Sequence, residues 1–233
     1  MNSKRNSKLT LALLLAFGLP ASAQLQPART IILIGPPGSG KTVQAEALRK
    51  AYKIPAVSMA QLLHEEINRK SPMGKALAAS LESGELLADG PANDLMKARL
   101  LRPDAGRGFI LDGYPATEGQ ARAMDQWLAE HQLPQPTVVI LSVPEEVSRD
   151  RMIGRRRAGD ERENIERRVR DYREVGRLVE RWYGSERTVR VDGTGSPEDV
   201  ALRIATGIDA VQSRQGLKVR SSPDNGGLKQ RQR

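Results

Sequence analysis

The sequence predicts an α/β fold in which a five-stranded parallel sheet carries helices on both faces. Five short aliphatic or β-branched runs end in turn residues, as buried strands do, and segments with helical spacing separate them. Strands that alternate with helices form parallel sheets with both faces covered. The expected strands are residues 30–34, 54–57, 108–111, 137–141 and 188–191.

Helical spacing of apolar residues marks the segments between these strands. The clearest case is the longest, 161–182, where Ile165, Val169, Tyr172 and Val179 recur on one face of a helix. Further examples of segments with helical spacing are residues 42–50, 59–68, 91–101 and 117–131.

The charge of the chain is unevenly distributed. Its 233 residues hold 37 Lys and Arg against 28 Asp and Glu, a formal charge of +9. Residues 1–23 contain three basic residues and no acid, and residues 214–233 contain six basic residues and one acid, so residues 24–213 are nearly neutral. This does not favour a nucleic-acid-binding domain, and 3% aromatic residues are too few for base-stacking platforms.

Residue types that are missing exclude several chemistries. The chain has no cysteine, which excludes disulfides, thiolate metal sites and a catalytic thiol. It has two histidines, which excludes a histidine-rich metal site.

The two ends of the chain differ from its centre. Three basic residues precede the apolar run 9–19, which is followed by Ala21-Ser22-Ala23. This pattern predicts a signal peptide cleaved after Ala23 and a periplasmic or secreted protein; the apolar run is too short to span a bilayer. The alternative is an uncleaved extension on a cytoplasmic protein. The basic residues 214–233 are expected to be a disordered tail, leaving one domain at 24–213.

A phosphate-binding loop follows the first expected strand directly. The segment matches G-x-x-x-x-G-K-[ST] in its strand-then-helix context. The glycines let successive N–H groups point inward, the helix directs its positive end at the anion, and the lysine reaches the terminal phosphates. The last hydroxyl can ligate Mg²⁺. We therefore expect a nucleotide site at Gly35, Pro36, Pro37, Gly38, Ser39, Gly40, Lys41 and Thr42.

Asp112 stands at the end of the third expected strand, just before Gly113. An acid at this place beside a phosphate loop can hold a metal ion through water. The alternative is an ordinary Asp-Gly turn.

Arginines are concentrated after the fourth expected strand. Arg151 and Arg155 are four residues apart and therefore share a helical face, from which they can grip one anion. Four acids between residues 160 and 166 favour the alternative, an exposed helix held by ion pairs. The spacing alone leaves both interpretations open for Arg151, Arg155, Arg156, Arg157, Arg167 and Arg168.

Taken in order, these motifs resemble those of adenylate kinase and related nucleoside-monophosphate kinases. The likeness covers about residues 30–208 and includes the phosphate loop, Asp112-Gly113-Tyr114-Pro115, Gln120 and the segment 83–89, which is similar to the family's G-E-L-V-P-D stretch. It implies the P-loop NTPase fold of adenylate kinases, with a small helical acceptor-binding insertion at about 58–90 and a vestigial lid at about 155–160.

The resemblance also implies roles by position. ATP would lie in the phosphate loop with its adenine on Arg151. The catalytic positions would be Lys41, Asp112, Arg155, Arg157 and Arg168, with Mg²⁺ held by Thr42 and, through water, by Asp112. The acceptor would be bound at Met59, His64, Leu87, Gly113 and Gln120.

The acceptor site departs from the family pattern. Met59 and His64 stand where the family has a threonine and an arginine that clamps the monophosphate, and Ala116 replaces a second arginine. Each bidentate arginine–phosphate contact contributes about 1.5–3 kcal/mol. The two replacements are therefore expected to weaken acceptor binding. The lid is also shortened, which predicts weaker exclusion of water and more ATP hydrolysis.

Three functional hypotheses follow. The first is transfer of the γ-phosphoryl group from Mg-ATP to a nucleoside monophosphate, with AMP the expected acceptor. The second is a kinase on the same scaffold with another acceptor, and the third is a nucleotide-binding protein without transfer activity. We expect ATP and Mg²⁺ as cofactors. We also expect a monomer, because no apolar seam or heptad repeat indicates an oligomer.

Overall fold

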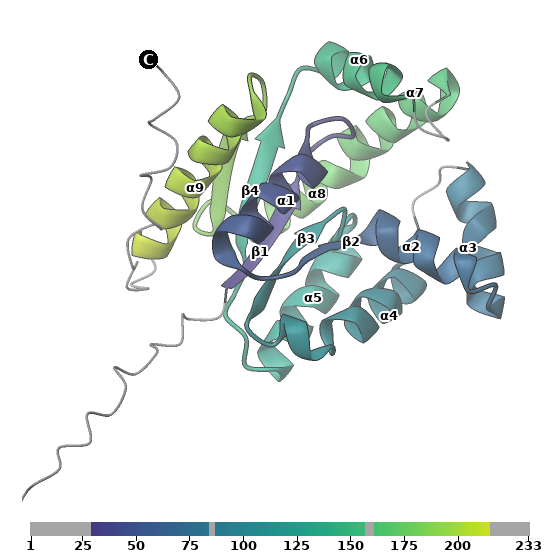
Figure 1. Cartoon of the computed structure of the whole chain (residues 1–233), viewed down its shortest axis with the longest axis horizontal. Helices are drawn as coiled ribbons and strands as arrows, with labels where there is room; N and C mark the ends of the chain where they lie inside the picture. Colours follow the sequence, from purple (N-terminus) through teal and green to yellow (C-terminus); the bar gives the residue numbers. More distant parts are fainter. Residues whose placement is uncertain (1–28, 84–86, 157–160, 215–233) are drawn as a thin grey trace, which may run out of the picture.

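The computed structural model describes residues 29–83, 87–156 and 161–214, and strands alternate with helices along them (Figure 1). The strands are β1 (Arg29–Ile34), β2 (Ala56–Ser58), β3 (Gly108–Asp112), β4 (Thr137–Ser142) and β5 (Thr188–Asp192). The α-helices are α1 (Lys41–Tyr52), α2 (Met59–Asn68), α3 (Pro72–Ser83), α4 (Asp89–Leu100), α5 (Glu118–Glu130), α6 (Glu145–Arg155), α7 (Arg162–Asp171), α8 (Arg177–Tyr183) and α9 (Pro197–Arg214). A short 3₁₀ turn occupies Pro103–Ala105.

The strands form one parallel sheet in the order β2-β3-β1-β4-β5. The predicted five-stranded parallel sheet is therefore confirmed. β1 lies at its centre, with Ile32 level with Leu111 of β3 and Val138 of β4. Because all strands run the same way, the loop after β1 and the residues after β3 meet at one edge of the sheet.

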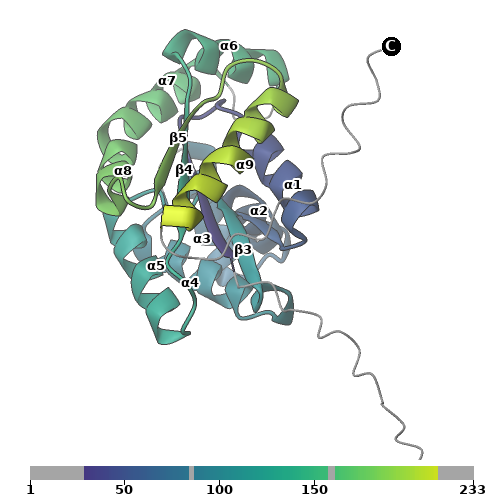
Figure 2. The ribbon, with the colours of Figure 1, turned by 90° about the vertical axis from the view of Figure 1, so that its left-hand side faces the viewer.

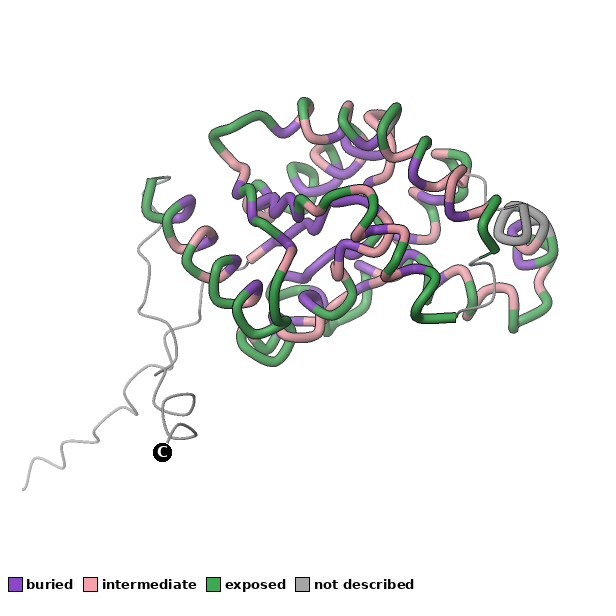
Figure 3. The backbone as a smooth tube through the Cα atoms, turned by 90° about the horizontal axis from the view of Figure 1, so that it is seen from above, coloured by how far each residue is buried: buried purple, intermediate pink, exposed green. Residues whose placement is uncertain are grey.

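Helices cover both faces of the sheet, as Figure 2 shows. Ile32 and Ile34 of β1 pack on the face that carries α4, α5 and α8. Ile31 and Leu33 pack on the opposite face, against α1 and α9. Successive strand residues point to opposite faces, so the sheet is buried on both sides, as Figure 3 shows for the centre of the molecule.

β2 begins two residues later than the predicted strand at 54–57. Pro55 has no N–H to donate to the ladder, although its carbonyl accepts a hydrogen bond from the Ile110 N–H at 2.9 Å. Ladder pairing of β2 with β3 therefore starts at Ala56, level with Ile110.

The prediction of one continuous helix at 161–182 is wrong, because this segment is divided into two helices. α7 and α8 are joined by a π-helical turn, Tyr172–Gly176. Ile165 and Val169 of α7 pack on α6, whereas Val179 of α8 packs on the main core. The two halves therefore bury against different partners, and the π turn lies where the partner changes.

Like α6 and α9, α3 was not named from helical spacing, although it lies within residues 58–90, where the resemblance implies a helical insertion. The start of α3 is marked by its own residues. The Ser71 hydroxyl accepts the Gly74 N–H at 2.8 Å and Pro72 is the first helical residue, as at many helix starts. The predicted leader at 1–23, residues 157–160 of the lid and residues 215–233 of the tail lie outside the described residues. Among the helices that are described, none combines the length and apolar character needed to span a bilayer.

Candidate active site

The phosphate loop connects β1 to α1 with a backbone that requires glycine. Gly38 has φ +78°, and a Cβ there would lie 2.5 Å from the Ser148 carbonyl oxygen of α6. At Gly35 a Cβ would lie 2.6 Å from the Leu141 carbonyl oxygen of β4. The loop is therefore held between the ends of β4 and α6, above the carboxyl end of the sheet.

Substitution of Gly38 by alanine is expected to destabilise the protein more than the same change at Gly40. Both residues have positive φ, +78° and +95°, which costs a residue with a side chain about 1–3 kcal/mol. Only Gly38 adds the collision with Ser148; at Gly40 nothing in the described chain lies within 4 Å of the added Cβ. Urea denaturation measures the difference, and equal free energies of unfolding for the two variants would contradict the close approach.

Lys41 points its ammonium into the loop. Its Nζ donates to the carbonyl oxygens of Gly35 at 2.8 Å and Pro36 at 2.9 Å. Burial lowers the pKa of Lys41 to about 8, with the Asp112 charge opposing this and the Arg168 and Arg155 charges adding to it. The positive charges of Arg155 and Arg168 thus oppose that of Lys41, and a bound anion would offset this repulsion.

This pKa predicts a pH dependence of nucleotide binding. Below pH 8 the Lys41 ammonium is charged and ready for a phosphate. A bound anion raises its pKa, so binding above pH 8 must first take up a proton. The affinity for ADP, measured by calorimetry without magnesium, is therefore expected to fall as the pH rises above 8, with proton uptake visible in buffers of different ionisation enthalpy. A constant affinity and no proton uptake from pH 7 to 9.5 would contradict this assignment.

Thr42 and Asp112 place two oxygen atoms together beside the loop. The Thr42 hydroxyl donates to Asp112 Oδ2 at 2.7 Å, and Asp112 is buried at the end of β3. Hydroxyl and carboxylate oxygens suit Mg²⁺, which usually takes one or two protein ligands and completes its shell with phosphates and water. The pair therefore fits the predicted magnesium site. Elsewhere in the described chain, no group of three or more His, Asp and Glu could hold a metal ion.

The arginines divide between the two interpretations that the sequence left open. Arg151 of α6 donates from both terminal nitrogens to the Gly193 carbonyl at 3.1 Å and from one of them to the Gly38 carbonyl at 3.5 Å, so it joins the phosphate loop to the loop after β5. Arg155 and Arg168 act on the Lys41 charge. Arg167, in contrast, donates to Asn164 on its own helix. Arg157 lies outside the described residues.

The acceptor residues gather on the other side of Asp112. Met59 begins α2 next to Gly113, with its Cβ 3.8 Å from where a Cβ of Gly113 would stand. Gln120 of α5 is buried; its Oε1 accepts the Ala116 N–H at 2.7 Å and its Nε2 lies 3.4 Å from the Leu87 carbonyl oxygen. His64 is exposed on α2 and is not brought to this group by any described hydrogen bond.

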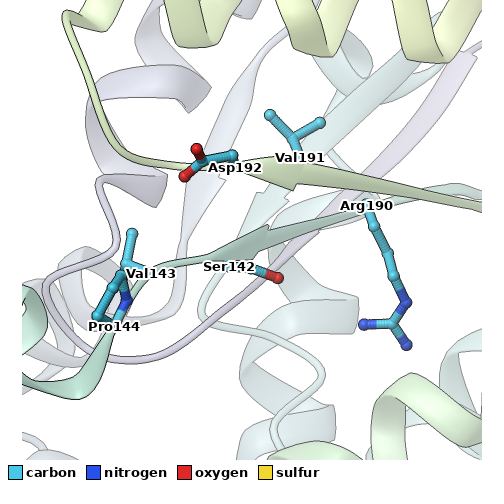
Figure 4. Close-up of a pocket in the computed structure, with 6 residues that line it drawn as sticks. All are labelled: Ser142, Val143, Pro144, Arg190, Val191 and Asp192. Carbon is cyan, nitrogen blue, oxygen red and sulfur yellow. The ribbon is translucent and has the colours of Figure 1, made fainter.

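A hollow of about 310 Å³ opens at the carboxyl ends of β4 and β5 (Figure 4). It adjoins the loop that Arg151 holds, because the Gly193 N–H donates to the Ser142 carbonyl at 2.8 Å. No sequence motif predicts this hollow, and only the glycine after β5 indicates a close approach of backbones. Its lining residues are Ser142, Val143, Pro144, Arg190, Val191 and Asp192.

A parallel sheet with a phosphate loop at its carboxyl edge, an inward lysine and a hydroxyl–carboxylate pair define a P-loop nucleotide-binding protein. A family model described as adenylate kinase matches residues 33–188. The chain is 36% identical over 185 residues to an adenylate kinase of Stenotrophomonas maltophilia (strain K279a), covering 77% of this chain and 99% of that protein. It is 34% identical over 191 residues to an adenylate kinase of Micrococcus luteus, covering 80% and 93%. The chain belongs to the adenylate kinase family, whose members are nucleoside-monophosphate kinases.

Proposed function

We propose that the protein transfers the γ-phosphoryl group of Mg-ATP to AMP. The observation that carries the proposal is the position of Asp112-Gly113, which lies between the donor side, Lys41 with Thr42, and the acceptor side, Met59 with Gln120. The relatives named as adenylate kinases support the same reaction.

The residues would perform the reaction by positioning and charge. The Lys41 ammonium, now bonded to two loop carbonyls, would turn to the terminal phosphates of ATP. Arg155 and Arg168 would surround the transferring group, whose charge is spread over its equatorial oxygens. Thr42 and, through water, Asp112 would hold Mg²⁺, which would supply positive charge to the phosphates of ATP. Gln120 would hold the acceptor base.

A second candidate is an ATP-binding protein with another acceptor or without transfer activity. The replacement of two family arginines by His64 and Ala116 favours it, because Ala116 brings no charge to the acceptor side and His64 is exposed.

A panel of nucleoside monophosphates separates the two candidates. The protein is incubated with Mg-ATP and AMP, CMP, GMP or UMP, and diphosphate formation is followed by chromatography, with ATP binding measured in parallel. We expect ADP from AMP at the highest rate. ATP binding without a diphosphate product from any acceptor would overturn the proposed reaction and support the second candidate.

We also infer that the protein acts as a monomer outside the cytoplasm after loss of residues 1–23. The basic start, apolar run and Ala21-Ser22-Ala23 support export. Expression of the full chain in a Gram-negative host tests this: mass spectrometry of the periplasmic fraction is expected to give a chain beginning at Gln24. A full-length protein in the cytoplasm would contradict it.

A further inference from the structure

The acceptor-side glutamine is held by a second layer of polar contacts. Thr117 is the N-cap of α5, and its Oγ1 accepts the Gln120 N–H at 3.1 Å. The same hydroxyl donates its proton to Asp89 Oδ1 at 2.6 Å. A chain of two hydrogen bonds therefore runs from Gln120 through Thr117 to a carboxylate on the first residue of α4.

The Asp89 side chain packs closely against Gly119 of α5. Its Oδ2 lies 2.1 Å from where a Cβ of Gly119 would stand, so the carboxylate rests against the first turn of α5 at a place that only glycine leaves open. A negative charge at a helix N-terminus is stabilised by the unpaired N–H groups and the helix dipole. Asp89 is thus a charged support for the start of α5 as well as a hydrogen-bond acceptor.

Asp89 also lies on the same segment as Leu87, one of the two residues that the Gln120 side chain contacts. Leu87, whose carbonyl lies 3.4 Å from Gln120 Nε2, is two residues before Asp89 on the same chain segment. The Asp89 carboxylate therefore helps to hold this segment against the start of α5. A second tie lies one turn along α4, where the Tyr114 hydroxyl donates to Asn93 Oδ1 at 2.6 Å.

We propose that Asp89 and Thr117 form a clamp that positions Gln120 and Leu87 for the acceptor. This inference rests on the proposed function, because it assigns the clamp to the acceptor and not to ATP. The clamp residues do not touch substrate; they act through Gln120 and the Leu87 carbonyl. The clamp matters more here because the acceptor-side arginines are replaced at His64 and Ala116, which leaves more of the acceptor binding to base contacts.

The test compares Thr117→Val and Asp89→Ala with wild type in steady-state kinetics. Loss of a capping contact corresponds to about tenfold in an equilibrium constant, so the KM for AMP is expected to rise about tenfold while the KM for ATP stays within about twofold. Thr117→Ser, which keeps the hydroxyl, is expected to restore the wild-type KM. Wild-type acceptor KM in both clamp variants would overturn the inference and leave the proposed function standing.

A matched control removes the same kind of cap elsewhere. The Ser196 hydroxyl accepts the Asp199 N–H at 3.1 Å and donates to Asp199 Oδ2 at 2.7 Å at the start of α9. Ser196→Ala is expected to lower stability to a similar extent without changing the KM for AMP. A rise in the KM for AMP equal to that of Thr117→Val would overturn the clamp, because loss of stability alone would then explain both.

A wild-type protein that makes no ADP from AMP would overturn the proposed function. The clamp is then tested by measuring the affinity for AMP of wild type and Thr117→Val by calorimetry. A weaker AMP affinity in Thr117→Val, with unchanged ATP affinity, supports the clamp in that case. Equal AMP affinities, or no AMP binding to wild type, would overturn it.

Discussion

Replacement of Lys41 by methionine is expected to lower the rate of ADP formation by about 10²–10³-fold, the loss that follows removal of one group that stabilises transition-state charge. The Lys41 ammonium lies inside the phosphate loop, within 2.9 Å of two carbonyl oxygens. Methionine keeps the length of the side chain and removes only the charge and the donors. Steady-state kinetics with saturating AMP measures the change.

The control is the same substitution on the same helix. Lys50 of α1 is exposed, and its ammonium lies 3.5 Å from Glu46, a surface pair of a kind that contributes little. Lys50→Met is expected to retain the wild-type rate. A Lys41→Met enzyme as active as Lys50→Met would show that this loop does not hold the reacting phosphates.

Replacement of Ala116 by arginine is expected to lower the KM for AMP by about tenfold to a hundredfold, the range of one bidentate arginine–phosphate contact. Ala116 precedes the N-cap of α5, and its N–H already contacts Gln120. With His64→Arg added, the combined gain is expected to reach about 10²–10⁴-fold, because the family resemblance assigns both positions to the same acceptor phosphate.

Ala129→Arg is the matched control, since Ala129 is exposed near the other end of α5 and adds the same charge away from the acceptor side. Its KM for AMP is expected to equal that of wild type. No decrease in the KM for Ala116→Arg, or an equal decrease for Ala129→Arg, would show that Ala116 does not face the acceptor phosphate.

The centre of the sheet could be predicted because β1, β3 and β4 are buried on both faces. Such strands consist of continuous aliphatic runs, as at Ile31–Ile34 of β1, where both faces are in the core. The boundaries that differed depended on interactions outside the run. Pro55 cannot pair through an N–H at the start of β2. A π turn stands where the packing partner changes between α7 and α8, and apolar spacing does not reveal it.

The phosphate loop could be named from the sequence because one contiguous motif contains it. Lys41 and Thr42 follow the glycines directly, and Asp112 follows a recognisable strand. The Asp89–Thr117 pair could not be predicted in this way. Its members are 28 residues apart, and their hydrogen bond depends on how α4 packs against α5.

The central claim is that the donor and acceptor sides act in one reaction, and ³¹P NMR of the protein with equal amounts of Mg-ATP and AMP tests it most directly. We predict that ATP and AMP disappear together and that two ADP form for each ATP consumed, with the rate lost in Lys41→Met. ATP loss that yields inorganic phosphate while AMP remains would contradict the claim.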